Sequence, residues 1–300
     1  MGKAVLISNP KSIYDDVPEV RYHFPRQYLK RVERAQGDWI IYYESGSDGG
    51  RQAYFATAQI VSVVPDERRS DHYYAYVAHY SDFPNPVPWR HELGYWESAF
   101  GTDLRRPISG PAQNAVRPIT DGEYEAISRA GFANMIDLEN RTGLGTNLGV
   151  SDIAASFQRP IIERLVAKPF RDAAFTTCVR AAYDSTCAAT GLKLINGEGR
   201  CEIEAAHIRP VGGGHDGPDS VRNGLALSRT AHWLFDRGLI SLADDGKILF
   251  ASKRHLPEIG RVQSMLHADG YMRLPADSLQ KPHRQFLEYH RDKIYAPKAG

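Results

Sequence analysis

The chain has 300 residues, 42% of them hydrophobic and 24% charged, which suits an ordinary soluble protein with room for two domains. A formal net charge of +1 excludes a uniformly basic nucleic-acid-binding surface, so any DNA-binding face must be a local patch. The first residues contain too short an apolar run for a signal peptide, and no stretch approaches a membrane span. We therefore expect a cytoplasmic protein with no membrane partner.

The cysteines are few and odd in number: Cys178, Cys187 and Cys201. Such a count argues against a disulfide framework and favours a reducing compartment. The sequence contains no CxxC pair, so no structural zinc is expected. The thiols are most simply small buried apolar groups.

The first 95 residues predict a compact β-barrel with short helices. Ala4–Ile7 and Asp38–Ser45 predict strands, and Ala53–Asp66 predicts one long strand that could carry a bulge. His72–Tyr80 alternates with period two and predicts a further strand, which the prolines of the following FPNPVPW segment would break. A short helix is expected around Arg26–Ala35.

The middle of the chain predicts a short helix and then a linker. Thr120–Gly131 predicts a helix that opens with a capping box. Leu138–Gly149 is rich in Gly and Asn and predicts a linker. We place the domain boundary near residue 150, with a first domain over residues 1–150, its linker starting near residue 110, and a second domain over residues 151–300.

The sequence of the second domain predicts a ββα unit, with its core at residues 170–250 and with flanking helices. Cys201–Ile208 and Asn223–Ser228 predict two short strands, separated by a glycine-rich loop. Ser228 could cap a helix through the sequence TAHWLFD, with Gly238 just past its end. The whole chain therefore belongs to the α+β class.

This ββα unit carries side chains suited to metal-dependent phosphodiester hydrolysis. The reaction needs a base to activate water and a divalent cation to neutralise charge on the phosphate, and a neutral imidazole is a suitable base. The first predicted strand presents His207, and the second begins at Asn223. His232 and Asp236 are four residues apart on the predicted helix, so both leave the same face and can share one cation. Mg²⁺ or Mn²⁺ is expected, and Ni²⁺ or Co²⁺ would also be acceptable.

The motifs AAHI, NGLAL and HWLFDRGLI resemble those of a branch of the HNH endonuclease family, over Phe170–Phe250. The resemblance implies a ββα-metal nuclease domain. In that domain His207 would be the general base and Asn223 the residue that orients it. By the same resemblance His232 and Asp236 would bind the metal ion.

One position departs from the family pattern. Many HNH enzymes have Asp or His immediately before the base, as a further metal ligand, and this chain has Ala206. Either fewer protein groups hold the cation, or Glu204 contributes. Glu204 and His207 are three residues apart, so in a regular strand they would face opposite sides.

The first 110 residues resemble the PUA-like superfamily, which includes EVE and SRA domains, in the runs YDD…YHFPRQYL and GDWIIYYE…GGRQAYFATAQI. The resemblance implies a domain that flips a modified cytosine out of the duplex and reads it in an aromatic pocket. Fusion to an HNH domain is the layout of modification-dependent restriction endonucleases. The implied partner is double-stranded DNA containing 5-methylcytosine or 5-hydroxymethylcytosine. Because one HNH site cuts one strand, a homodimer or two bound monomers would be needed for a double-strand break.

A flipped base must stack on flat side chains, each contributing roughly 1–3 kcal/mol against an unstacking cost of a few kcal/mol. Tyr22 and Phe24 are favoured for this pocket because they lie in a loop-like stretch, and Trp39 and Tyr43 come next. Asp71 could accept a hydrogen bond from the cytosine amino group. Aromatic rings at alternating positions could equally form the barrel core.

Candidate contacts to the DNA backbone are basic residues near these two sites, namely Arg21, Arg26, Arg171 and Arg209. The N-terminal pair could equally belong to a solvated surface. His215 lies in the glycine-rich loop, beside the expected position of the scissile phosphate.

Two other functions stay open at this point. The chain could be an HNH nuclease that recognises a DNA sequence, a DNA structure or another modification. It could also be a DNA-binding module with weak catalysis, which the alanine at position 206 would favour.

Overall fold

The computed structural model describes residues 2–9, 13–46, 50–101, 108–112, 114–133, 135, 162, 165, 168–197, 199–251 and 258–295. The chain divides into two compact units, residues 1–174 and 175–300. The predicted linker Leu138–Gly149 and the predicted boundary near residue 150 lie outside the described residues. None of the described helices has both the length and the apolar character needed to cross a membrane.

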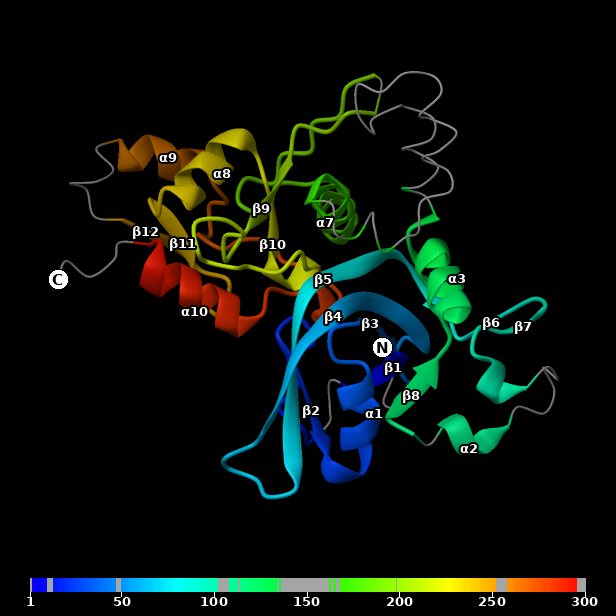
Figure 1. The fold of residues 1–300 in the computed structure, drawn as a ribbon. Coiled ribbons are helices and arrows are strands. Elements are labelled where there is room, and N and C mark those ends of the chain that lie inside the picture. Colours follow the sequence, from blue (N-terminus) through cyan, green and yellow to red (C-terminus); the bar gives the residue numbers. More distant parts are fainter. Residues whose placement is uncertain are drawn as a thin grey trace, which may run out of the picture. The chain divides into compact units, whose positions relative to one another are not determined.

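The first unit is built on a curled six-stranded sheet in the order β2-β5-β4-β3-β1-β8 (Figure 1). Its strands are β1 Lys3–Ser8, β2 Arg21–Pro25, β3 Trp39–Glu44, β4 Ala53–Pro65, β5 His72–Pro88 and β8 Val116–Ile119. Neighbours pair antiparallel except β1 and β3, which pair parallel. Strands β2 and β8 are the two ends of this order, so the expected barrel is an open half-barrel in the described part of the chain.

The two longest strands explain the curl. The register between β4 and β5 shifts at several points along their length, and such bulges increase the local twist of a strand. The bulge predicted in the long strand is therefore confirmed. The predicted end of the next strand at Tyr80 is wrong, because β5 continues to Pro88. Only His72–Tyr76 of β5 pairs with β2, so the prolines lie where β5 has a partner on one side alone and can be tolerated.

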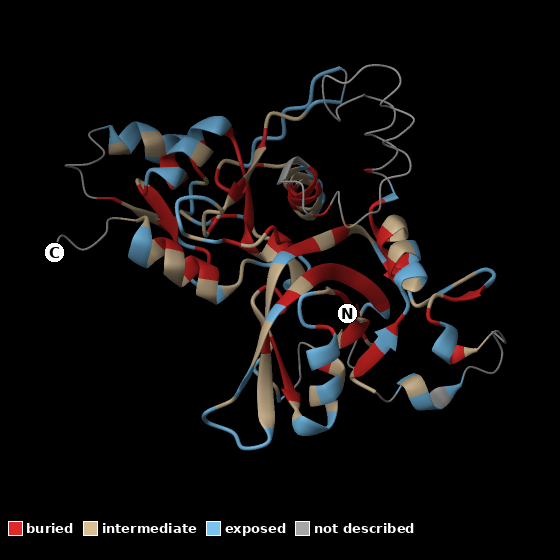
Figure 2. Ribbon diagram, viewed as in Figure 1, coloured by how far each residue is buried: buried red, intermediate tan, exposed pale blue. Residues whose placement is uncertain are grey.

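Both faces of this sheet are buried, which Figure 2 shows as continuous red along its central strands. Alternation along β3 sends Ile41 and Tyr43 to one hydrophobic cluster and Ile40 and Tyr42 to another. Helix α3 (Asp121–Gly131) packs in the first cluster, and helix α1 (Leu29–Arg34) supplies Val32 to the second. The remaining elements of this unit are η1 Arg26–Tyr28, β6 Arg90–His91, β7 Gly94–Tyr95, η3 Ser98–Phe100 and α2 Ser109–Ala112.

The capping box predicted for α3 is confirmed. The Thr120 side chain accepts a hydrogen bond from the Glu123 amide at 3.2 Å, and the Glu123 carboxylate accepts one from the Thr120 amide at 2.6 Å. This reciprocal pair satisfies two backbone donors that the first turn of a helix leaves without partners.

The second unit contains the predicted ββα arrangement. Strand β9 (Glu204–His207) pairs antiparallel with β10 (Gly224–Leu227), and helix α8 (Arg229–Asp236) follows. The Ser228 side chain caps α8 by accepting from an amide of its first turn, as predicted. The other elements are α7 Lys168–Ala182, which contains the junction of the two units, η4 Val221–Asn223, β11 Ile240–Leu242, β12 Ile248–Phe250, α9 Ile259–Met265, η5 Ser278–Gln280 and α10 Arg284–Lys293.

Candidate functional site

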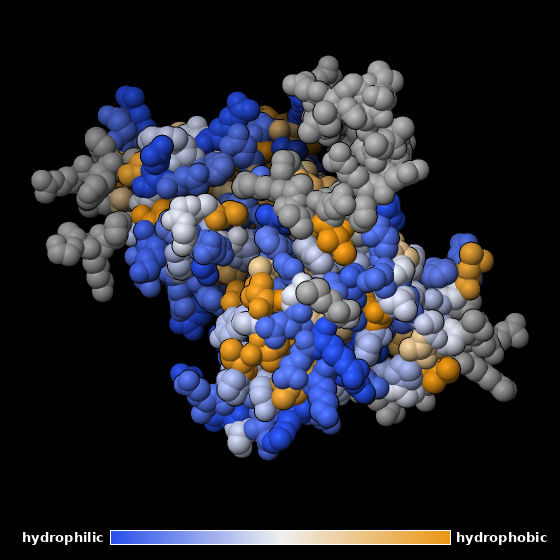
Figure 3. Space-filling model, viewed as in Figure 1, coloured by the Kyte–Doolittle hydropathy of each residue, from blue (hydrophilic) through white to orange (hydrophobic). Residues whose placement is uncertain are grey.

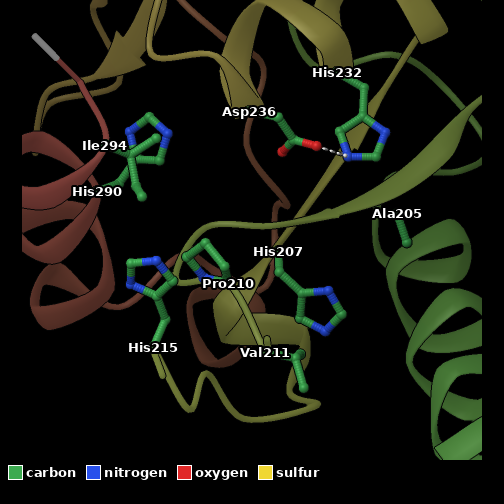
Figure 4. A pocket seen from close by; sticks show the side chains of 9 residues that line it. All are labelled: Ala205, His207, Pro210, Val211, His215, His232, Asp236, His290 and Ile294. Carbon is green, nitrogen blue, oxygen red and sulfur yellow. Dashed lines mark ion pairs between the residues drawn. The ribbon is translucent and has the colours of Figure 1, made fainter. Parts of the chain in front are cut away.

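Strand β9, the loop after it, and helices α8 and α10 surround a cavity of about 410 Å³ in the second unit. Four histidines line it: His207, His215, His232 and His290. Asp236 lines it as well, and Figure 4 shows its ion pair with His232 on α8. The structure therefore brings His207, His232 and Asp236 to one cavity, as expected from the four-residue spacing of His232 and Asp236 and from the resemblance to the HNH family.

The ring of His207 is held from two directions. It stacks on Phe175, with ring centroids 3.8 Å apart and planes 13° from parallel. Its Nε2 lies 3.1 Å from a carboxylate oxygen of Asp219, which is buried. An Nε2–H donated to this carboxylate leaves the Nδ1 lone pair to accept a proton, which is the tautomer that a general base needs. Asp219 was not predicted, because a single Asp in a loop of turn-forming residues has no spacing signal.

The side chain of Asn223 holds the backbone of the loop rather than the ring of His207. Its amide oxygen accepts from the Arg209 amide at 2.8 Å. Its amide nitrogen donates to the carbonyl oxygens of Arg209 at 3.0 Å and Pro218 at 2.9 Å. The hydrogen bonds of Asn223 go to the loop backbone, whereas Asp219 contacts the ring of His207, so Asn223 can orient that ring only through the loop. Asn223 is fully buried, so these bonds form where water cannot replace them.

Both ring nitrogens of His232 face carboxylates. Its Nε2 lies 3.3 Å from Asp236 Oδ2, and its Nδ1 lies 2.8 Å from Glu204 Oε2. The hydrogen bond to Asp236 raises the pKa of His232 most, the bond to Glu204 raises it further, and burial opposes both. Glu204 contacts the far edge of the ring, because it is the first residue of β9 and α8 packs on that strand.

Comparison with known proteins agrees with this local arrangement. Residues 187–243 match the model of an HNH endonuclease family. This stretch is an HNH endonuclease domain. It contains the two strands, the loop between them and α8, and so every residue that the sequence predicted for catalysis. No curated protein resembles the chain closely enough to count as a match.

Several solved structures are distantly similar. The modification-dependent restriction endonuclease TagI is 14% identical, with 96% of this chain and 81% of that chain covered and a TM-score of 0.34. A protein from Rhodopseudomonas palustris, Rpa0253, is 16% identical over 44% of this chain and 94% of its own, with a TM-score of 0.30. The phosphorothioation-dependent endonuclease ScoMcrA is 14% identical over 95% of this chain and 57% of its own, with a TM-score of 0.20. All three scores lie below 0.5, so none of them establishes the fold of this chain.

HNH nucleases generally use divalent metal ions, and two donors of this domain suit one. His232 Nε2 and Asp236 lie together at the cavity, and an imidazole with a carboxylate is acceptable to Mn²⁺ and related ions. No group of three or more His, Cys, Asp or Glu side chains is placed for a metal within the described ranges. The donor set therefore fits a cation held by two protein groups, with water in its other positions. Ala206 is fully buried, so the position before His207 faces the interior.

In such a site Glu204 would orient His232 rather than bind the metal ion itself. By accepting Nδ1–H of His232, its carboxylate leaves the Nε2 lone pair for a cation beside Asp236. A carboxylate behind a ligating histidine is the usual way in which proteins fix the ring and its tautomer. We therefore assign Glu204 to the orientation of His232.

His290 on α10 is a structural member of the cavity wall. Its ring stacks on Phe235 at 3.8 Å between centroids and 10° between planes. Its Nδ1 lies 2.8 Å from Ser241 Oγ, and its Nε2 lies 3.2 Å from the Phe235 carbonyl oxygen. Burial lowers its pKa to about 4, so it is neutral near pH 7. The sequence did not indicate this residue, because it lies far along the chain from the HNH motifs.

The aromatic residues predicted for a base pocket lie in the core of the first unit. Tyr22 and Phe24 are in strand β2, not in a loop as expected, and both are buried in one hydrophobic cluster. Trp39 and Tyr43 are buried in the other. Asp71 is exposed, has a positive φ of 58°, and forms an ion pair with the nearby Arg26.

The four arginines predicted to contact DNA have partners within the protein. Arg21 pairs with Asp15, and Arg26 pairs with Asp71 at 3.1 Å, both near the surface. Arg171 is 8% exposed and donates to the Leu165 carbonyl oxygen at 2.8 Å, so a phosphate contact does not agree with its burial. Figure 3 shows hydrophilic residues interspersed with smaller hydrophobic groups over the visible face.

The assignment of Glu204 leads to a prediction about metal affinity. Glu204→Gln keeps the shape of the side chain but removes the charge behind His232. We expect the dissociation constant for Mn²⁺, measured by calorimetric titration of the full chain, to rise roughly 10–100-fold. Glu258→Gln, which changes an exposed carboxylate outside the cavity, is the matched control. Equal affinities for the Glu204 variant and the wild type would contradict the assignment.

The burial of His290 leads to a prediction about acid stability. Its folded pKa of about 4 is below the ordinary value of 6.5, so the stability that it contributes is complete above pH 6.5 and is lost as the pH falls towards 4. Between pH 7 and pH 5 this loss amounts to about 2 kcal/mol. Denaturant titrations should show a drop in the free energy of unfolding of that size, and His290→Gln should make the curve flatter. The same slope in both proteins would show that His290 is not the group responsible.

Proposed function

We propose that this protein is a DNA endonuclease that hydrolyses phosphodiesters in the cavity of its HNH domain with a divalent metal ion. We further propose that it is a modification-dependent restriction enzyme, acting on DNA that contains 5-methylcytosine or 5-hydroxymethylcytosine. The observation that carries the hydrolytic part is the convergence of His207, His232 and Asp236 on one cavity, within residues that match an HNH endonuclease family.

The residues of the cavity divide the chemistry between them. His207 accepts the proton of the attacking water, and Asp219 stabilises the imidazolium that results. His232 and Asp236 would hold the cation, which would supply positive charge for the phosphate oxygens when bound. Asn223 keeps the loop after β9 closed, so that the ring of His207 and the loop residues stay at the same cavity.

The specificity for a modified cytosine is assigned to the first unit. The support is the resemblance of the sequence of residues 1–110 to PUA-like readers. A homodimer is proposed as well, because cutting both strands requires two HNH sites.

A second candidate is an HNH endonuclease with another specificity, for a sequence, a DNA structure or a different modification. The burial of Tyr22, Phe24, Trp39 and Tyr43 in hydrophobic clusters favours it, because these rings already pack against the protein. Under this candidate the first unit still binds DNA, but through other residues.

Matched plasmids distinguish the candidates. The protein is incubated with Mg²⁺ or Mn²⁺ and with plasmids that are unmodified, contain 5-methylcytosine, or contain 5-hydroxymethylcytosine. Selective cutting of a modified plasmid is expected. Equal cutting of all three would support the second candidate. Retained DNA binding without cutting of any plasmid would show a binding module and would overturn the hydrolytic proposal.

Removal of the proposed base should abolish turnover without affecting DNA binding. We expect His207→Ala to slow cleavage by about 10²–10⁴-fold, the usual contribution of a general base, while a gel-shift assay without metal shows unchanged affinity. His91→Ala, which changes a histidine of the first unit, is the control and should cut at the wild-type rate. Cleavage by the His207 variant at the wild-type rate would remove this residue from the mechanism.

A further inference from the structure

One histidine of the cavity has no role in the function proposed above. His215 lies in the loop after β9 and lines the cavity together with His207, His232 and Asp236. The loop closes where the Gly217 amide donates to the Pro210 carbonyl oxygen at 2.8 Å. A Cβ at Gly217 would lie only 1.9 Å from the Arg209 carbonyl oxygen, so the closure requires glycine and fixes the position of the loop.

The imidazole of His215 is held by one of its two nitrogens. Its Nδ1 lies 2.8 Å from the hydroxyl of Tyr289 on α10, and the two rings meet edge to face at 5.8 Å. The guanidinium of Arg209 lies 4.6 Å from the centroid of the Tyr289 ring and donates to the carbonyl oxygen of His215. Arg209 and Tyr289 therefore fix both the backbone and the ring of His215.

The opposite edge of the ring is left open by a glycine. A Cβ at Gly213 would lie 3.4 Å from Cδ2 and 3.7 Å from Nε2 of His215, in van der Waals contact with that edge. Because residue 213 is glycine, no side chain from this position covers Nε2. His215 lines the cavity, so a group bound in the cavity can approach its ring.

The other histidines of the cavity are already engaged. His232 has a carboxylate at each nitrogen, and His290 is buried with both nitrogens bonded to the protein. His207 is the proposed base. His215 is therefore the imidazole of the cavity wall that can give a proton to a substrate atom.

We propose that His215 is a second catalytic histidine, which protonates the sugar oxygen that leaves the phosphate. This inference rests on the proposed endonuclease function. The water oxygen forms a new bond to phosphorus as its proton passes to His207. The bond from phosphorus to the bridging sugar oxygen breaks, and that oxygen takes the Nε2 proton of the His215 imidazolium. His215 becomes a neutral imidazole, with its Nδ1–H still donated to the hydroxyl oxygen of Tyr289. Each histidine then exchanges one proton with solvent, which restores the starting state.

The leaving group supplies the test. A sugar alkoxide is a strong base and leaves readily only when it is protonated, whereas a thiolate leaves without a proton. Once the wild-type cleavage position has been mapped, two duplex oligonucleotides are compared, one with the natural bridging oxygen and one with sulfur in that place. Single-turnover rates are measured with Mn²⁺ for the wild type, His215→Gln and His215→Asn, after circular dichroism has confirmed that each variant is folded.

We expect both His215 variants to cut the oxygen-bridged duplex about 10²–10⁴-fold more slowly than the wild type. They should cut the sulfur-bridged duplex within about threefold of the wild-type rate. An equal loss on both duplexes would show that His215 binds the phosphate or supports the loop, and no loss on either would show that it has no catalytic role. Either result overturns this inference but leaves the endonuclease. Failure of the wild-type protein to cut DNA in the mapping experiment would instead refute the proposed function itself.

Tyr289 is a positioning residue under this inference. Tyr289→Phe keeps the ring under Arg209 but removes the hydroxyl that holds Nδ1 of His215. We expect cleavage of the oxygen-bridged duplex to slow by roughly tenfold, and cleavage of the sulfur-bridged duplex to be unchanged. Tyr271→Phe, at an exposed tyrosine outside the cavity, is the matched control. Equal slowing on both duplexes would contradict the positioning role.

Discussion

The candidate site depends on the three hydrogen bonds that the buried amide of Asn223 makes to the loop after β9. These bonds join the backbone at Arg209 and Pro218 to the start of β10, so the ends of the loop cannot move apart. Because the amide is fully buried, loss of any one bond would leave a polar group without water, which costs about 1–3 kcal/mol. The loop can therefore be rich in glycine and still return His215 to one place.

A second regularity concerns the histidine rings at the cavity. Asp219 faces one nitrogen of His207, Glu204 faces one nitrogen of His232, and Tyr289 faces one nitrogen of His215. In each case a hydrogen-bonding partner outside the cavity wall holds one nitrogen of the ring and so helps to set its orientation and tautomer. His290 differs, because neutral groups of the protein hold both of its nitrogens. Its ring packs in the cavity wall instead.

The sequence predicted the parts of this site that depend on local spacing. Helix α8, with its cap at Ser228, places His232 and Asp236 on one face, and the capping box of α3 follows from four consecutive residues. The sequence did not predict Asp219 or Tyr289 as partners of the histidine rings. Asp219 reaches His207 from an irregular loop, and Tyr289 is far from His215 along the chain. The prediction that the core aromatic residues line a base pocket failed for another reason. Both faces of the half-barrel are covered, so alternation along β3 places every ring in a hydrophobic cluster and cannot separate packing from binding.

The division of the chain into two units limits which residues can take part in the proposed cleavage and which in recognition. Every group that the cavity uses, from the stacking ring of Phe175 to the hydroxyl of Tyr289, belongs to residues 175–300. Among the described residues, the proposed hydrolytic chemistry therefore uses no side chain from the first unit. In that unit the buried Glu97 pairs with Arg117 at 2.7 Å and accepts a further hydrogen bond from Tyr54, so these two buried charges are paired within the packed interior. A base that entered between its core rings would have to displace this packing. Recognition of a modified cytosine by Tyr22 or Trp39 would thus require the core to open, whereas recognition by exposed residues would not.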